Sequence, residues 1–200
     1  MSGLAHWRAA WRRFGREDGS VTIEAVIMVP TLILFYITSF SFFDAYRTQT
    51  VLTKSGYLVG DLLSRETGTV RPADIAGLRG MFAFLTFSPD TPDRRTTELR
   101  VSEIWREVDA AAGIDRHVVV WTHGTGGMAG LDADELADIV LDMPKLAPND
   151  RVTAVETFIA YRPPFFVGLP AYRMETLVLT RQRYSGQLCF VPAGGGSTCA

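Results

Sequence analysis

Cysteine and histidine are scarce in this chain, and positive charge is not in excess. Its 200 residues include two cysteines and three histidines, and 20 basic residues stand against 22 acidic ones. No basic stripe is present to neutralise phosphate backbones, so nucleic acid is not an expected partner. Internal repeats and low-complexity tracts are absent too. The remaining composition is that of a globular protein, 47% hydrophobic and 11% aromatic.

Sets of residues that carry catalysis are also missing. No Ser-His-Asp or Cys-His set and no nucleophile elbow stands out, so the chain is not expected to be an enzyme and no cofactor or metal is expected. The glycine cluster at residues 124–130 lacks the lysine of a P-loop and precedes acidic residues, which predicts a flexible loop. His117 and His123, six residues apart on a predicted strand, are expected to share a face, but no third metal ligand is evident. Asp132 and Glu135 resemble a helix capping box.

What the chain does have is a long apolar run. Residues 25–43 are nineteen residues without a charge, close to the ~20 needed to cross a bilayer as a helix, and Glu24 stands just before them. Basic residues are concentrated on the N-terminal side, whereas only Arg47 and Lys54 follow closely. The positive-inside rule therefore predicts a cytoplasmic leader at residues 1–19, a transmembrane segment at 20–43, and an extracytoplasmic domain at 44–200.

A cleaved secretory signal peptide is the main competing interpretation. It fits poorly, because the apolar run is longer than the ~7–15 residues of a signal sequence and no Ala-x-Ala site follows it. Pro30, inside the run, is tolerated by transmembrane helices. The run therefore predicts a retained, single-pass anchor.

The residues around this run carry a resemblance to a known family. Gly19 followed by Ser20, with Glu24 five residues after the glycine and Pro30 within the apolar helix, resembles the start of TadE/TadG-like proteins. These are minor pseudopilins of the tight-adherence (Flp-type) pilus system of bacteria. The match covers about the first fifty residues. Ala25 stands where major Flp pilins have tyrosine, which argues against the main fibre subunit and leaves the TadE-like and TadG-like branches open.

The resemblance implies a processing site, partners and a location. A prepilin peptidase would cut between Gly19 and Ser20, and Glu24 and Pro30 would serve assembly with other pilus-assembly proteins and pseudopilins. The chain would lie in the bacterial inner membrane, with its N-terminus cytoplasmic and residues 44–200 periplasmic. Glu24, one helical turn beyond the new amine, would neutralise it, unless it is merely an interfacial residue that snorkels to the headgroups. The alternative function is a signal-anchored extracytoplasmic ligand-binding or enzymatic domain unrelated to pili.

The rest of the chain predicts an α+β fold with an antiparallel sheet of about four strands. A continuous helix is expected from residue 20 to residue 66, in which Gly56 and Gly60 mark either a small-xxx-small helix contact or close packing on the sheet. Two further helices and four strands are expected by pattern: helices at 72–85 and 134–143, and strands at 98–107, 117–122, 151–161 and 173–184.

Two features near the C-terminus complete the prediction. Cys189 and Cys199, ten positions apart, are expected to form a disulfide, worth about 3 kcal/mol, if this end is exported to an oxidising compartment. Residues 163–167 form an apolar loop, in which Phe165 and Phe166 either contact a partner or fold back to close the core.

Overall fold

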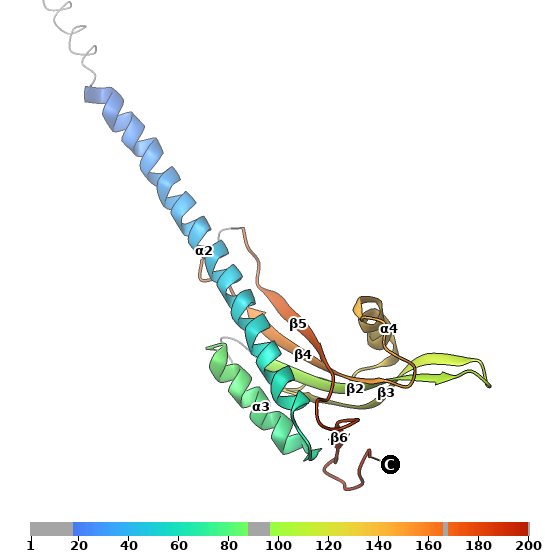
Figure 1. Cartoon of the computed structure of the whole chain (residues 1–200). Helices are drawn as coiled ribbons and strands as arrows, with labels where there is room; N and C mark the ends of the chain where they lie inside the picture. The colour runs from blue at the N-terminus through green and yellow to red at the C-terminus, as the bar shows by residue number, and fades with distance from the viewer. Residues whose placement is uncertain (1–17, 88–96, 166–167, 200) are drawn as a thin grey trace, which may run out of the picture. The chain divides into compact units, whose positions relative to one another are not determined.

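The computed structural model describes residues 18–87, 97–165 and 168–199, with the side chains of residues 18–20 outside that description (Figure 1). Within these residues the predicted α+β class is confirmed: three helices accompany a four-stranded antiparallel sheet and a two-stranded parallel one. The helices are α2 (Asp18–Ser64), α3 (Pro72–Leu85) and α4 (Ala133–Asp142); the strands are β1 (Thr69–Val70), β2 (Thr97–Asp109), β3 (Ile114–Thr125), β4 (Arg151–Tyr161), β5 (Tyr172–Thr180) and β6 (Cys189–Phe190).

The described chain divides into two compact units. The first comprises the described part of Met1–Asp44 together with Pro164–Leu169, and the second comprises Ala45–Pro163 and Pro170–Ala200 as far as they are described. Helix α2 runs through the boundary and contributes one half to each unit.

The second unit is built on the sheet β3-β2-β4-β5, in which every neighbouring pair is antiparallel. Val101, Val155 and Val178 lie opposite one another across β2, β4 and β5, so one row of branched side chains crosses the sheet. All three are buried. β-Branched residues pack well on a pleated surface, which explains why these segments form strands.

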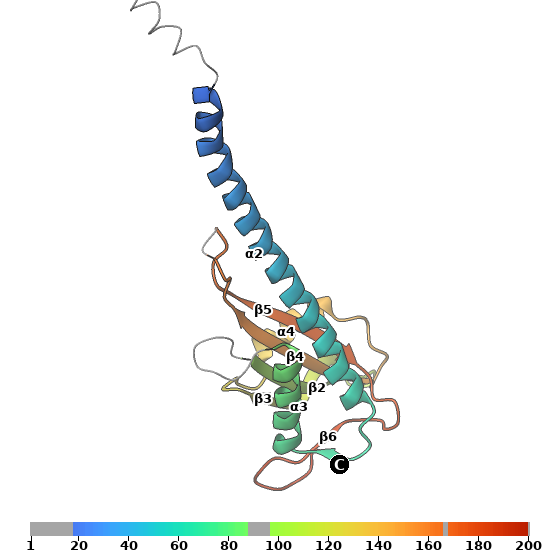
Figure 2. The same cartoon turned by 90° about the vertical axis from the view of Figure 1, so that its left-hand side faces the viewer.

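The second half of α2 and helix α3 cover one face of this sheet (Figure 2). A methyl group added at Gly56 would lie 3.2 Å from the hydroxyl of Thr157, and one added at Gly60 would lie 3.0 Å from a methyl of Val178. These glycines therefore allow α2 to pack closely on the sheet, one of the two alternatives left open by the sequence. Beside them, Leu52 is fully buried against this face.

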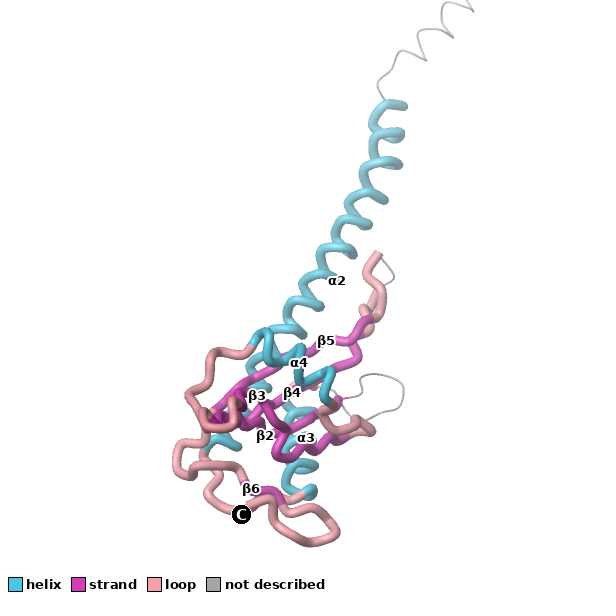
Figure 3. Tube along the Cα trace, turned by 90° about the vertical axis from the view of Figure 1, so that its right-hand side faces the viewer, coloured by secondary structure: helices cyan, strands magenta, loops and turns pink. Residues whose placement is uncertain are grey.

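Helix α4 covers the opposite face (Figure 3). The predicted capping box is present: the Asp132 carboxylate accepts the backbone N–H of Glu135, and the Glu135 side chain accepts that of Asp132. The apolar side of α4 packs into a hydrophobic cluster on this face, which consists of Ile104, Leu131, Ile139, Leu146, Val152 and Ala154. The sheet thus has a helical layer on each side.

A β-bulge in β3 overturns one expectation. Glu103 pairs with Trp121 but the next residue of β2 pairs with Val119, so β3 carries one extra residue. An extra residue reverses the alternation of side chains between the two faces. His117 and His123 therefore lie on opposite faces, and the expectation that they share a face is wrong.

Several boundaries also differ from the prediction. Helix α2 ends at Ser64 rather than at residue 66, and β5 ends at Thr180 rather than at residue 184. The backbone N–H of Arg183 instead donates to the carbonyl of Ser64 at 2.9 Å, which draws this segment away from the sheet. The short parallel pair β1 and β6 was not predicted from the sequence, because two-residue strands have no period to detect.

Candidate functional site

The described part of the first unit consists mainly of an apolar helix whose side chains are mostly exposed. Apolar side chains are exposed on every side of α2 here, and the helix is long and apolar enough to cross a membrane. Such a helix is stable only where something apolar surrounds it. Its exposed residues include Val21, Ile23, Val26, Ile27, Met28, Val29, Leu32, Ile33, Leu34, Phe35 and Tyr36.

Three hydroxyl groups inside this segment form hydrogen bonds with the helix backbone. The hydroxyls of Thr31, Thr38 and Ser41 donate to the backbone carbonyls of the residues four positions earlier, at 2.8, 2.8 and 3.0 Å. Helix α2 continues through Pro30 without interruption. Pairing these three hydroxyls within the helix suits a hydrocarbon environment, where water cannot supply partners.

The predicted processing and assembly residues lie at the start of α2. Gly19 and Ser20 belong to its first turn, and Glu24 lies one turn further on with an exposed side chain. Ser20 and Glu24 are four positions apart along the helix, which corresponds to a rise of about 6 Å. Glu24 is therefore the charged side chain that directly precedes the uncharged run 25–43.

Phe165 belongs to the same unit as this helix. Its ring meets that of Phe40 edge to face, with the ring centroids 6.0 Å apart, and 45% of the residue remains exposed. Edge-to-face geometry is a favourable arrangement for aromatic pairs. Phe166, the other predicted contact residue, lies outside the described residues.

The second unit contains a groove of about 500 Å³ beside α4. At its floor Arg100, which is 3% exposed, donates from Nε and Nη2 to both carboxylate oxygens of Glu156, at 2.6 and 2.7 Å. Its Nη1 donates to Glu135 at 2.5 Å. Burial alone would lower the pKa of Arg100, but its hydrogen bonds and charge pairing with the two carboxylates raise it. Arg100 therefore stays charged and is fully engaged within the protein.

The rim of the groove is acidic overall. The guanidinium of Arg173 lies 3.9 Å from the centre of the Phe158 ring and pairs with Glu98 at 2.9 Å. Five carboxylates and only two arginines line the groove; the carboxylates are Glu135, Asp138, Asp142, Glu156 and Glu175. An anionic ligand would be repelled here.

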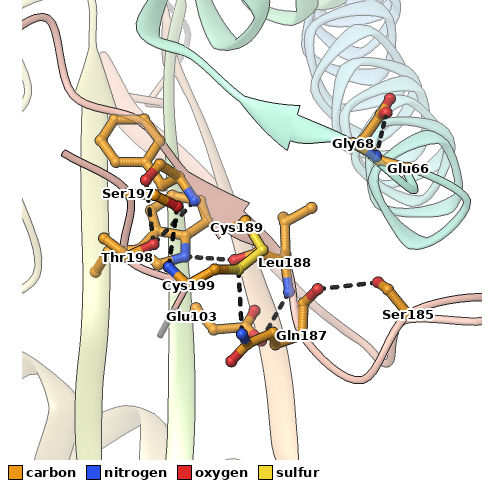
Figure 4. Close-up of a disulfide and its surroundings, with 12 residues drawn as sticks. Glu66, Gly68, Glu103, Ser185, Gln187, Leu188, Cys189, Ser197, Thr198 and Cys199 are labelled. Carbon is orange, nitrogen blue, oxygen red and sulfur yellow. Dashed lines mark hydrogen bonds between the residues drawn. A yellow bond between two sulfur atoms is a disulfide. The ribbon is translucent and has the colours of Figure 1, made fainter. Parts of the chain in front are cut away.

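The predicted disulfide joins Cys189 and Cys199, with their Cα atoms 5.3 Å apart (Figure 4). The segment before it is held by the sheet: Trp121 Nε1 donates to the carbonyl of Leu188 at 2.8 Å, and the N–H of Leu188 donates to Glu103 at 3.3 Å. The Trp121 ring also stacks on that of Phe190 at 4.7 Å. The disulfide loop is thus attached to the core through its first residues.

Glu103 is a carboxyl group in the core that no sequence pattern revealed. It is 1% exposed, accepts the hydroxyl of Thr153 at 2.7 Å, and lies on the same face of β2 as the apolar residues Leu99, Val101 and Trp105. Burial raises its pKa, although the hydrogen bonds from Thr153 and Leu188 and the charge of Arg151 act in the opposite direction. These contacts assign Glu103 to holding the C-terminal segment rather than to catalysis.

The other candidate motifs acquire structural roles. Gly124 packs so closely on the backbone of Met128 and Ala129 that no side chain fits, and Gly126 and Gly127 have positive φ angles of 75° and 91°. The glycine cluster therefore forms a turn at the end of β3, where a loop was expected. Within the described ranges no group of three or more His, Cys, Asp or Glu side chains is arranged to hold a metal.

No protein-family model, curated protein or solved structure matches this chain. Two features of the chain itself bear on its function: the exposed apolar half of α2, and the sheet on which the other half packs.

Proposed function

We propose that this chain is a minor pseudopilin-like membrane protein that takes part in assembling a Tad (Flp-type) pilus. It crosses the bacterial inner membrane once, with its N-terminus in the cytoplasm and residues 44–200 in the periplasm. A prepilin peptidase removes the leader by cutting after Gly19, so that the mature chain begins at Ser20. The family resemblance of the first fifty residues motivates this proposal.

The observation that supports the proposal best is the division of α2 into two unlike halves. Up to Asp44 its side chains are mostly apolar and mostly exposed, whereas beyond it Leu52, Val59 and Leu63 are buried in the second unit. A simple anchor would need only the first half, joined by any linker. One unbroken helix that serves both purposes suits a subunit whose membrane helix must carry its folded domain into an assembly.

Glu24 gives the membrane half a means of recognition. A charged side chain costs ~2.5–3.5 kcal/mol at the centre of a membrane helix, and less near its end. A cation within one turn reduces that cost, and the amine created at Ser20 supplies one on the same chain or on a neighbouring helix. Because apolar helices in a bilayer have no hydrophobic drive to associate, such a polar pair would set their register.

The disulfide supports the proposed location of the folded domain. Disulfides persist in oxidising compartments, including the periplasm, and are rare in the cytosol. Cys189 and Cys199 both lie in the second unit. A periplasmic second unit is thus consistent with the direction predicted by the basic leader.

Deletion and complementation in a bacterium that makes Flp-type pili test the proposal. Removing the gene is expected to reduce the number of pili seen by electron microscopy, and the native chain is expected to restore it. Gly19→Val should fail to restore pili, whereas the same substitution at Gly77, where an added side chain meets nothing within 4 Å, should succeed. An unchanged number of pili in the deletion strain would refute the proposal.

One observation favours a second function. The acidic groove beside Phe158 would suit a cationic ligand if the second unit were a ligand-binding domain unrelated to pili. Normal piliation without the chain, together with ligand binding that Asp138→Asn and Asp142→Asn abolish, would support this alternative.

A further inference from the structure

The loop between β4 and β5 has the composition of a membrane-contacting segment. The ten residues 163–172 carry no charge, and they are flanked by Arg162 and Arg173. Phe165 is nearly half exposed, and Leu169 is partly exposed. An uncharged, apolar loop of this length is unfavourable in water and marks a surface that something covers.

The partner of this loop is indicated by where it lies. Pro164–Leu169 is the only described part outside the N-terminal stretch that belongs to the same compact unit as the apolar half of α2. The contact between Phe165 and Phe40 joins the two. Phe165 thus packs against the helix that is long and apolar enough to cross a membrane.

The position of Phe40 along that helix sets the depth of the contact. The nineteen-residue apolar run 25–43 rises about 28 Å, close to the ~30 Å hydrocarbon thickness of a bilayer. Phe40 lies three residues before its end, about 4.5 Å short of the boundary along the helix axis. Phe42 and Phe43 are exposed at the same level. Aromatic side chains are enriched at this depth, where the hydrocarbon meets the headgroups.

We propose that the β4–β5 loop is a second membrane contact, in which Phe165 and Leu169 insert into the interfacial region of the bilayer beside Phe40. A membrane that surrounds the run 25–43 also surrounds the exposed side of Phe40, so lipid is available to the ring packed against it. The loop and the helix together would fix the tilt and rotation of α2, as interfacial anchors do. This inference requires that α2 crosses a membrane and is independent of the role in pili.

Fluorescence of the full chain in vesicles tests the proposal without any partner protein. An environment-sensitive fluorophore is attached to Leu169→Cys in chains purified with the native disulfide oxidised, so that only the new thiol reacts. The vesicles contain phosphatidylcholine and phosphatidylglycerol at a large excess of lipid. Leu34→Cys, within the apolar run, provides the membrane reference, and Ala111→Cys, in the exposed turn after Asp109, provides the water reference.

The expected result is a fluorophore at position 169 that is several-fold less accessible to aqueous iodide than the one at Ala111. It should also be quenched by lipids with a nitroxide high on the acyl chain more than the one at Leu34. Adding Phe165→Ser should restore iodide access at position 169, whereas Tyr184→Ser, which removes an exposed aromatic ring of the second unit, should leave it unchanged.

Two outcomes would overturn the proposal. Iodide access at position 169 equal to that at Ala111 would place the loop in water. Protection that disappears when the chain is diluted into more lipid would mean that a second copy, rather than the bilayer, covers the loop.

Discussion

Replacing Arg100 with methionine is expected to lower the free energy of unfolding by about 3–5 kcal/mol. Arg100 is 3% exposed and its partner Glu156 is 8% exposed, so the substitution leaves a buried carboxylate without its two hydrogen bonds. The second carboxylate, Glu135, contributes less, because its side chain is 47% exposed and water can replace the arginine. Glu135→Gln should therefore cost less than about 1 kcal/mol.

The double variant Arg100→Met, Glu156→Leu tests whether the loss comes from the unpaired carboxylate of Glu156. Both buried charges are then gone, and leucine at position 156 would lie opposite Leu177 of β5. Replacing a buried ion pair with apolar residues is commonly neutral or stabilising. The double variant should therefore recover most of the stability that Arg100→Met loses.

Urea unfolding of the full chain in detergent micelles, followed by near-ultraviolet circular dichroism, measures these changes. Arg116→Met is the matched control, because Arg116 also forms a pair, with Glu107, but its side chain is 65% exposed; a loss of about 0–1 kcal/mol is expected. A loss below about 1 kcal/mol for Arg100→Met would show that Glu156 does not depend on the buried arginine. A double variant that loses as much stability as Arg100→Met and Glu156→Leu lose separately, added together, would contradict the expected recovery.

Three further predictions follow from the packing and from buried charge. Burial raises the pKa of Glu103, so the folded chain holds this proton at higher pH than the unfolded chain; its contribution to stability is complete below about pH 4.5 and is lost as the pH rises through the folded pKa. Glu103→Gln should remove this loss of stability, which amounts to about 1.4 kcal/mol for each pH unit by which the folded and unfolded pKa values differ. The measurement is the urea midpoint as a function of pH, and a variant whose midpoint depends on pH as the native chain's does would contradict the prediction. Gly60→Val should cost about 1–3 kcal/mol through overpacking, whereas Gly77→Val, in open space, should not destabilise; equal effects in the same urea assay would count against the packing. Replacing Cys189 and Cys199 with serine should cost about 3 kcal/mol, and a reductant should cause the same loss only in the native chain.

Much of the fold was predictable because its signals are local. The apolar run, the capping box of Asp132 and Glu135, and the strand-forming residues of β4 depend on neighbouring residues, and β4 was predicted with its observed bounds, Arg151–Tyr161. The disulfide was also predicted, from two cysteines and a glycine-rich link.

Features that depend on distant residues were not predictable. The bulge that separates the faces of His117 and His123 arises from the pairing of β3 with β2, which no single strand encodes. The pairing of Arg100 with Glu156 spans 56 positions. Glu103 interrupts an apolar face, and only its contacts with Thr153 and Leu188 explain why it is tolerated there.

The candidate site divides in the same way. Gly19, Ser20, Glu24 and Pro30 were recognised from sequence spacing, and the structure places them in the first half of α2. The contact of Phe165 with Phe40 joins residues 125 positions apart. This contact could not be predicted from the sequence, because it depends on how the chain folds.

The most direct test of the proposed function is the mass of the mature chain. Chains are extracted from membranes of cells that contain either an active prepilin peptidase or a catalytically inactive one, and their intact masses are compared. The chain is expected to begin at Ser20 with the active peptidase and to retain residues 1–19 with the inactive one. A chain that keeps its leader beside an active peptidase, or one cut near residue 45 instead, would contradict this expectation.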